Sequence, residues 1–286
     1  GYGFLAENSD FSNICEENGF TFLGPKPEII DAMGDKAQAK KTMLKAGVPV
    51  IPGSDGIIET SDDAKILAKE IGYPVMLKAS AGGGGRGMRF VSNESEIENS
   101  FNLASSEAKT AFNNGDMYME KFIENPRHIE IQLLADSYGN AVSLGERECS
   151  IQRRHQNLIE ESPSPVVSPK LRKLMGDAAV AGAKYVNYVG VGTIEFLLDK
   201  NKDFYFMEMN TRIQVEHPIT EMVTGVDLIK WQIKMHAGEK FPDYMKQIKL
   251  RGHSIECRIN AEDPNMNFAP SPMVIADFHI PGGKGV

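Results

Sequence analysis

Apolar and polar positions follow two different periods along the chain. Short apolar runs bounded by Gly and Pro are typical of strands, and stretches with apolar residues every three or four positions are typical of amphipathic helices. Because the two patterns alternate, we expect an α/β (α+β) fold. The expected helices cover residues 27–46, 61–71, 94–110, 168–185 and 226–237. The expected strands cover residues 20–23, 73–79, 88–91, 116–122, 128–136, 140–147, 192–198 and 204–210, with a new β-rich unit from residue 250.

Composition narrows the class of protein. The 286 residues carry a net charge of -8, which argues against a general nucleic-acid surface because such surfaces need an excess of Lys and Arg. The cysteines, Cys15, Cys149 and Cys257, are far apart and form no C-x-x-C pair, so we expect no structural zinc site and no disulfide framework. No apolar run approaches the roughly 20 residues that span a bilayer. We therefore expect no membrane partner.

The two ends of the sequence suggest a fragment. The chain opens on GYGFLAEN without a methionine and stops on PGGKGV, a turn-like string. We expect a piece cut at both ends, so any targeting segment would be invisible. The expected location is the cytoplasm, or an organellar matrix if the source is eukaryotic.

The stretch KASAGGGGRGMRF, residues 78–90, contains the spelling G-x-G-x-x-G. A dinucleotide-binding fold needs a helix directly after these glycines, but residues 88–91 continue as a strand. A Walker A loop is excluded because Met88 follows Gly87 where Lys is required. We interpret the loop as a mobile flap between antiparallel strands, with Lys78 at its base, that closes over a polyphosphate. A flexible surface hairpin is the alternative.

The segment FYFMEMNTRIQVEHP, residues 204–218, carries the strongest chemical signal. If it is extended throughout, alternate side chains share one face, and that face presents Glu208, Asn210, Arg212, Gln214 and Glu216. A solvated edge strand would also alternate in this way. Closing a hairpin across residues 199–203 would place Glu195 opposite or nearly opposite Glu208.

Two carboxylates held together need a shared proton or a cation. Asn210 adds an oxygen ligand, and Mg²⁺ binds through one or two carboxylates together with substrate phosphates. We therefore expect a magnesium site formed by Glu195, Glu208 and Asn210. The alternative is that the two carboxylates act as general acid and base in the hydrolysis of a glycoside, but the glycine flap would then have no function.

At this point the motifs resemble those of the ATP-grasp enzymes and, within them, biotin carboxylase. The matching stretches, in order, are GYGFLAEN, GPKPEIIDAMGDK, YPVMLKASAGGGGRGMR, MEKFIENPRHIEIQ, ERECSIQRRHQ, GTIEF, FMEMNTRIQVEHPITEMVTGVDL and GHSIECRINAEDP. The resemblance spans essentially the whole chain and implies an ATP-grasp fold with a glycine-rich lid. It implies four parts: the remnant of an N-terminal domain at 1–33, an ATP-grasp domain at 34–249, its lid at about 51–122, and the start of a C-terminal domain at 250–286.

The resemblance also implies roles for single residues. ATP would be bound by Lys36, Lys78, Gly83, Gly84, Glu120, Lys121, His128, Gln152 and His155, with Glu120 and Lys121 at the adenine hinge. Bicarbonate would be bound by Arg212, Gln214 and the N–H of Val215, with Glu216 as its general base and Arg258 stabilising the biotin ring. The metal would be Mg²⁺ or Mn²⁺. The alternative for His128 is a satisfied surface histidine, and the alternative for Arg153 and Arg154 is a solvated basic turn.

The implied reaction is the carboxylation of biotin on a biotin carboxyl carrier protein. Bicarbonate would attack MgATP to give carboxyphosphate, and a carboxyltransferase partner would pass the carboxyl group on. The acceptor would be acetyl-CoA, as in fatty acid synthesis, or else propionyl-CoA, methylcrotonyl-CoA or pyruvate. A homodimer is expected for the full-length protein. Closure of the flap would shield the intermediate from water, so we expect residues 81–87 to be weakly ordered without nucleotide.

Two positions depart from the family pattern, and two other functions stay open. Asn157 stands where the family normally has Lys, and Ser162 where E-E-A-P is usual. The lost cation puts one contact to phosphate or bicarbonate in doubt. The alternatives are another ATP-grasp ligase, which joins a carboxylate to an amine, and a nucleotide-binding module or truncated fragment without turnover.

Overall fold

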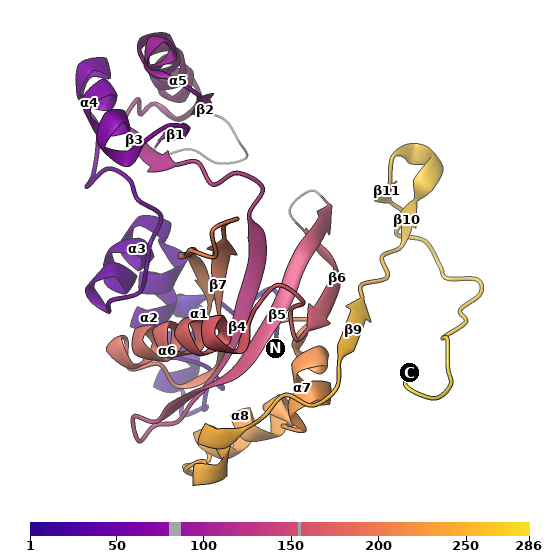
Figure 1. The fold of residues 1–286 in the computed structure, drawn as a ribbon. Helices are drawn as coiled ribbons and strands as arrows, with labels where there is room; N and C mark the ends of the chain where they lie inside the picture. Colours follow the sequence, from indigo (N-terminus) through magenta and orange to yellow (C-terminus); the bar gives the residue numbers. More distant parts are fainter. Residues whose placement is uncertain (80–86, 154–155) are drawn as a thin grey trace.

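The computed structural model describes residues 1–79, 87–153 and 156–286 (Figure 1). Gly83, Gly84, Arg154 and His155 lie outside the described residues, and so does most of the glycine flap whose order we predict. Figure 1 shows a lid of helices and short strands above a larger sheet, and an arm that leads away to the C-terminus. Within the described residues, no helix is long and apolar enough to cross a membrane.

A six-stranded sheet forms the centre of the molecule. Its strand order is β8-β7-β4-β5-β6-β9, and every neighbouring pair is antiparallel. The strands are β4 (Arg127–Ala135), β5 (Ala141–Arg153), β6 (Gln156–Ser162), β7 (Gly190–Leu198), β8 (Phe204–Asn210) and β9 (Ser254–Cys257). The hairpin of β7 and β8 confirms the pairing expected from the sequence.

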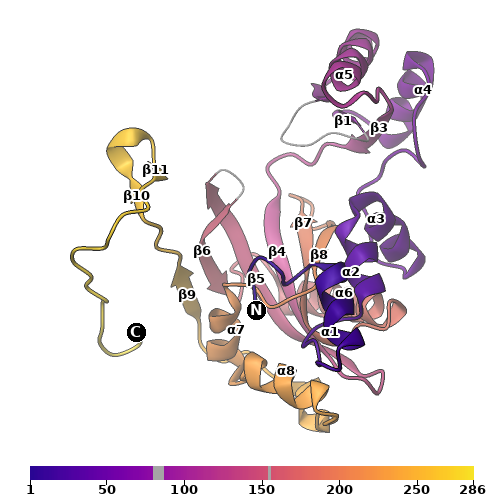
Figure 2. The ribbon, with the colours of Figure 1, turned by 180° about the vertical axis from the view of Figure 1, so that it is seen from behind.

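Helices cover both faces of this sheet (Figure 2). On one face α2 (Pro27–Gly34), α3 (Lys36–Lys45) and α6 (Pro169–Tyr185) pack on alternate residues of β4, such as Ile129 and Ile131. On the other face α8 (Leu228–His236) packs near Leu134 of the same strand. Helix α1 (Ser9–Glu17) precedes α2, and α7 (His217–Thr224) precedes α8. The middle of the sheet is therefore buried on both sides.

The lid has a core of its own. Its sheet has the order β2-β1-β3, formed by β1 (Val75–Ala79), β2 (Met88–Val91) and β3 (Met117–Lys121). The helices α4 (Ser61–Ile71) and α5 (Ile97–Phe112) pack on it, with the short 3₁₀ helix η1 (Glu94–Glu96) between β2 and α5. Lys78 pairs with Met88, which confirms that antiparallel strands flank the glycines. Gly87 has a φ of +69°, and a Cβ there would lie 2.7 Å from the Cβ of Ala79, so this position requires glycine.

Several elements differ from the expectation. Residues 20–23 form no strand in the structure, and the backbone N–H of Phe20 bonds instead to the carbonyl of Cys15. The single helix expected over 27–46 is broken, because the Asp35 side chain accepts from the N–H of Gln38 and caps a second helix. Strand β6 and helix α7 were not predicted. The N-cap at Ser168 is confirmed, since its hydroxyl accepts from the N–H of Leu171.

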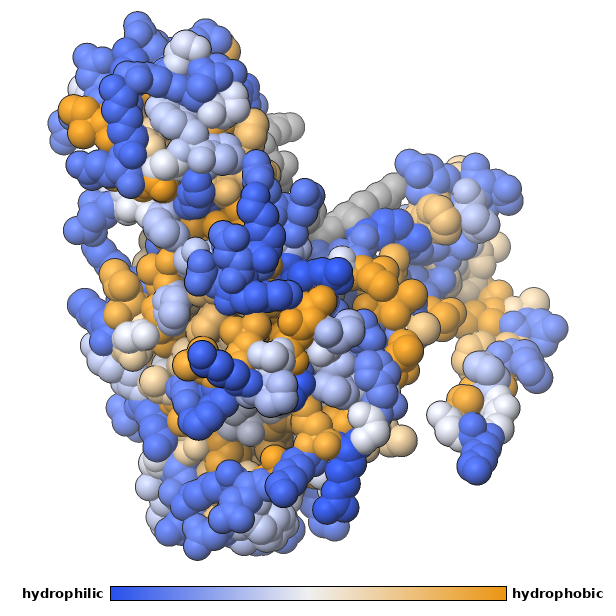
Figure 3. Space-filling model, in the orientation of Figure 1, coloured by the Kyte–Doolittle hydropathy of each residue, from blue (hydrophilic) through white to orange (hydrophobic). Residues whose placement is uncertain are grey.

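The C-terminal arm begins with the edge strand β9 and continues through β10 (Glu262–Asp263), η3 (Pro264–Met266) and β11 (Ala269–Pro270). The remaining 3₁₀ helix, η2 (Asp243–Gln247), lies before it. Exposed apolar side chains gather on this arm, among them Ile259, Met273 and Val274. Apolar atoms on the arm and on the facing surface are visible at the right of Figure 3.

Candidate nucleotide and anion site

The polar ladder expected over residues 208–216 is only partly a strand. Strand β8 ends at Asn210, residues 211–216 bend, and α7 begins at His217 with Pro218 in its first turn. The prediction of one extended face was therefore wrong beyond Asn210. The bend nevertheless returns Gln214 to the sheet, where its Nε2 donates to Oε1 of Glu195 over 3.1 Å.

Glu195 and Glu208 are direct cross-strand partners, as predicted. The Lys36 Nζ lies 3.1 Å from Oε2 of Glu208. The amide nitrogen of Asn210 donates to Glu195, and its Oδ1 accepts from Nη2 of Arg212 at 3.1 Å. The three expected metal ligands thus lie on the neighbouring strands β7 and β8, and the Lys36 ammonium already pairs with one of them, Glu208.

His128 contacts the same carboxylate from β4. Its Nε2 lies 2.6 Å from Oε2 of Glu195 and 3.6 Å from Oε1 of Glu130. Burial lowers the pKa of His128, but the bond and charge of Glu195 and the charges of Glu130 and Glu208 outweigh burial and raise it. His128, Glu130 and Glu195 are also close enough to share an ion. We assign His128 to the Glu195 carboxylate, which its Nε2 contacts directly.

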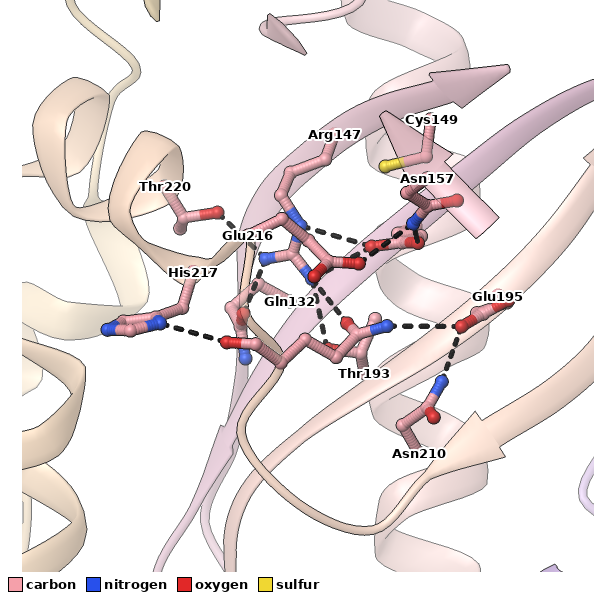
Figure 4. Close-up of polar contacts among 12 residues, drawn as sticks. Gln132, Arg147, Cys149, Asn157, Thr193, Glu195, Asn210, Glu216, His217 and Thr220 are labelled. Atoms are coloured by element: carbon pink, nitrogen blue, oxygen red, sulfur yellow. Dashed lines mark hydrogen bonds and ion pairs between the residues drawn. The ribbon is translucent and has the colours of Figure 1, made fainter. Parts of the chain in front are cut away.

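A fully buried arginine organises the floor of the site (Figure 4). The guanidinium of Arg147 donates twice to Oε2 of Glu130, from Nε over 3.1 Å and from Nη2 over 3.0 Å. It also donates to Gln214 over 2.6 Å and to Gln132 over 2.5 Å. We call the set of Arg147 and its partners the buried arginine cluster; its members are Glu130, Gln132, Arg147, Thr193, Gln214 and Thr220.

Asn157 joins this cluster to the expected base. Its Nδ2 lies 3.0 Å from Oε1 of Glu130 and 2.8 Å from Oε1 of Glu216, and its Oδ1 accepts from Gln152 over 2.9 Å. The Gln152 amide also lies 2.7 Å from Nδ1 of His128. Burial and the charges of Glu195 and Glu216 raise the pKa of Glu130 to about 7, although Arg147 opposes the shift. Asn157, which stands where the family normally has Lys, therefore forms a neutral bridge between the carboxyl groups of Glu130 and Glu216.

Glu216 is buried, with Arg258 on its other side. The Arg258 Nη2 lies 3.4 Å from Oε2 of Glu216. Two further glutamates, Glu160 on β6 and Glu256 on β9, are cross-strand partners beside this pair. Among the described residues, neither carboxylate oxygen of Glu160 has a hydrogen-bond partner, although the side chain is buried. Burial, followed by the charges of Glu216 and Glu256, raises the pKa of Glu160 to about 7.

Two of the expected nucleotide residues, Lys78 and Glu120, meet between the lid and α3. The carboxylate of Glu120 lies 2.5 Å from Nζ of Lys78 and 2.8 Å from Nζ of Lys40. Burial alone would raise the pKa of Glu120, but the two lysines outweigh burial and hold it below its usual value. We call Lys40, Lys78 and Glu120 the lysine–glutamate cluster. The Lys121 side chain instead donates to the carbonyls of Gly72 and Tyr73 over 2.8 Å each.

The comparisons with known proteins cover the whole chain. The sequence model described as "Carbamoyl-phosphate synthase L chain, ATP binding domain" matches residues 35–244, and the one described as "Biotin carboxylase, N-terminal domain" matches residues 1–30. A protein of Nostoc sp. named biotin carboxylase is 59% identical over 286 residues, which are all of this chain and 64% of that protein. The chain contains the ATP-grasp domain of the biotin carboxylases.

Solved biotin carboxylases share the fold. A biotin carboxylase domain of a thermophilic 2-oxoglutarate carboxylase, bound to bicarbonate, superposes with a TM-score of 0.94 at 53% identity, over 100% of this chain and 62% of that one. The Hydrogenobacter thermophilus 2-oxoglutarate carboxylase domain dimer, in complex with MgADP and bicarbonate, gives a TM-score of 0.85 at 55% identity, over 100% and 63%. The chain thus spans somewhat less than two thirds of these relatives.

Within this biotin carboxylase fold, sequence reasoning missed Arg147, Glu130 and Lys40. A signal existed for Glu130, because it follows His128 by two positions in the strand stretch R-H-I-E-I-Q and so shares its face. No comparable signal marks Arg147, whose partners come from four other segments of the chain. Val215 is half-buried in the bend between Gln214 and Glu216.

Proposed function

We propose that the full-length protein is a biotin carboxylase that uses ATP, magnesium and bicarbonate to carboxylate biotin on a carrier protein. The observation that carries the proposal is the position of Glu216, a buried carboxylate held by Asn157 over 2.8 Å and facing Arg258 at 3.4 Å. A general base must be held within hydrogen-bond reach of the proton that it takes, and a cationic group nearby allows the bicarbonate anion to bind beside a carboxylate. The bicarbonate and MgADP complexes of relatives support the assignment.

The residues present fit a magnesium ion. Glu195 and Glu208 are neighbours across two strands, and Asn210 lies next to them, which gives the oxygen-rich ligand set that Mg²⁺ prefers. Such an ion would neutralise charge on the phosphates of bound ATP. Manganese would accept the same ligands. We propose that Lys36 leaves Glu208 for a phosphate when nucleotide binds, because its side chain is 78% exposed and free to turn.

The chain's own residues then prepare bicarbonate. Arg212 and Gln214 hold the anion, the planar guanidinium matching its shape, while Glu216 takes its proton and makes the oxygen a better nucleophile. Attack on the γ-phosphate of ATP yields carboxyphosphate and ADP. Carboxyphosphate breaks down to carbon dioxide and phosphate, and the phosphate takes the N1′ proton of biotin. Arg258 stabilises the ring as it loses that proton, and the deprotonated N1′ attacks carbon dioxide to form carboxybiotin.

The carrier protein, the carboxyltransferase and the final acceptor belong to the same proposal. Acetyl-CoA is the acceptor we propose first, with propionyl-CoA, methylcrotonyl-CoA and pyruvate as alternatives, and relatives named for 2-oxoglutarate carboxylase add a further one. We also propose a homodimer and a cytoplasmic location. A nucleotide-binding module without turnover is the second candidate, which Asn157 favours because it replaces an expected cation with a neutral amide.

The test is ADP release by the full-length protein with and without bicarbonate and free biotin. We expect release to require bicarbonate and to rise with biotin. Release that is indifferent to bicarbonate would contradict the proposal and favour a ligase that joins a carboxylate to an amine. Binding of MgATP with no release under any condition would favour the second candidate.

A further inference from the structure

Glu7, near the start of the chain, reaches the residue that we assign to bicarbonate. Its Oε2 accepts from Nε of Arg212 over 2.7 Å. Its Oε1 accepts from the backbone N–H of Thr211 over 2.9 Å and lies 3.3 Å from the Thr211 hydroxyl. One carboxylate thus holds both the side chain of Arg212 and the backbone just before it.

The position of Glu7 is itself fixed. The next residue, Asn8, is the N-cap of α1, and its side chain accepts from the N–H of Phe11 over 2.7 Å. On the other side of the contact Thr211 is buried, so the backbone that Glu7 grips is part of the packed interior. The contact therefore links a capped helix to the bend that follows β8.

The remaining contacts of Arg212 complete the restraint. Its Nη1 donates to the carbonyl of Ile213 over 3.2 Å, and its Nη2 donates to Oδ1 of Asn210 over 3.1 Å. Each contact occupies one N–H group, so Nη1 and Nη2 each keep a further N–H. A pair of donors on the terminal nitrogens is the arrangement that binds two oxygens of a planar anion.

We propose that Glu7 is a positioning residue that fixes the guanidinium plane of Arg212 for bicarbonate. This inference rests on the proposed function and gives a role to a residue of the stretch GYGFLAEN to which the resemblance assigned none. Glu7 touches neither the anion nor ATP in this account. It acts through Arg212, so its loss is expected to change the affinity for bicarbonate rather than the affinity for nucleotide.

Charge and position predict opposite results when Glu7 is replaced. Glu7 is an anion beside an anion-binding group, so removing its charge would strengthen bicarbonate binding if only the charge mattered. Freeing Arg212 to move would weaken binding, because ordering a long side chain then costs free energy at each binding event. The direction of the change therefore separates the two explanations.

The experiment uses the full-length protein and the variants Glu7→Gln and Glu7→Asp. Gln keeps the length but removes the charge, whereas Asp keeps the charge but shortens the reach. We expect both variants to raise the KM for bicarbonate by about tenfold, while kcat and the KM for ATP stay within about twofold. Glu16→Gln, which changes an exposed glutamate of α1, is the matched control and should leave all three constants unchanged.

Titration of ¹³C-labelled bicarbonate, followed by NMR, gives the affinity independently of turnover, and melting curves confirm that the variants fold. A KM for bicarbonate in Glu7→Gln equal to or below that of the unaltered protein would overturn the positioning role alone. If the unaltered protein is indifferent to bicarbonate in both measurements, the proposed function fails and the inference falls with it.

Discussion

The buried arginine cluster and the lysine–glutamate cluster use the same chemistry in different surroundings. Arg147 and Glu130 are both fully buried, and several neutral side chains satisfy the remaining donors of the guanidinium. Lys40 and Lys78 are 27% exposed, and they share the single carboxylate of Glu120. The first cluster is fully satisfied by the protein. In the second, each lysine ammonium keeps donors for an incoming phosphate.

This difference indicates separate tasks. A buried ion pair is costly to break, because the partner left behind is an uncompensated charge in a low dielectric. A partly exposed pair costs little to break, since water replaces the lost partner. We infer that the arginine cluster maintains the geometry of the site and that the lysine–glutamate cluster exchanges partners when nucleotide binds. Substitutions in the two clusters should therefore affect different quantities.

The largest effect is expected for Arg147→Met. The change leaves the carboxyl group of Glu130 buried without its cation and removes the donor that holds Gln214. We expect the free energy of unfolding to fall by about 3–5 kcal/mol, measured by chemical denaturation. Lys173→Met, in the exposed pair with Asp177, is the control and should cost no more than about 1 kcal/mol. Equal losses in the two variants would show that the buried arginine cluster contributes no more to stability than an exposed ion pair.

A smaller effect is expected for Lys78→Gln, and it should fall on the affinity for ATP rather than on the free energy of unfolding. Lys40 remains paired with Glu120, so the free energy of unfolding should fall by less than about 1 kcal/mol. The loss of one charged contact to phosphate should weaken ATP binding by about 10- to 100-fold, measured by calorimetry on the full-length protein. Lys65→Gln, in an exposed pair of the lid with Glu98, should leave the ATP affinity unchanged. An unaltered ATP affinity in Lys78→Gln would contradict the phosphate role.

The smallest effect is expected for Glu160→Gln, which tests a buried carboxyl group without an arginine cluster around it. Its pKa is raised from 4.5 to about 7, mainly by burial, so between these values the folded protein binds more protons than the unfolded chain. The free energy of unfolding should therefore fall as pH rises through this window and level off above it. Glutamine does not titrate, so the variant should lose less stability than the unaltered protein between about pH 5 and pH 8.

Denaturation curves at about pH 5 and pH 8 measure how much the free energy of unfolding changes in the variant and in the unaltered protein. Glu256 titrates in the same window and should preserve part of the pH dependence in the variant, which is why we expect a modest change. The exposed Glu59→Gln serves as the control. Identical pH dependence in Glu160→Gln and the unaltered protein would show that Glu160 stays ionised when folded.

The sequence was sufficient for the features that depend on local period. Alternation in β7 and β8, with a short polar loop between them, predicted that Glu195 would face Glu208. The same reasoning failed beyond Asn210, because a bend can carry alternating polar residues as well as a strand. Pro218 marked the change, since proline is favoured in the first turn of a helix.

Features that depend on distant contacts could not be predicted. The motif E-R-E-C gives no sign that Arg147 is buried, because Gln132, Thr193 and Thr220 reach it only after the sheet and α7 have formed. Glu7 likewise meets Arg212 across 205 positions of the chain. Strand β6 was missed because its residues combine apolar and acidic types without a clean period, and its pairing with β5 contains register shifts.

The separate core of the lid has a consequence for how the protein tolerates sequence change. The apolar residues of the lid, from Ile58 to Met119, pack on one another and not on the core beneath the central sheet. Substitutions on one side of that division therefore require no matching substitutions on the other. A lid from another family member could replace this one as a single cassette, provided that Lys78 and Glu120 keep their places on β1 and β3.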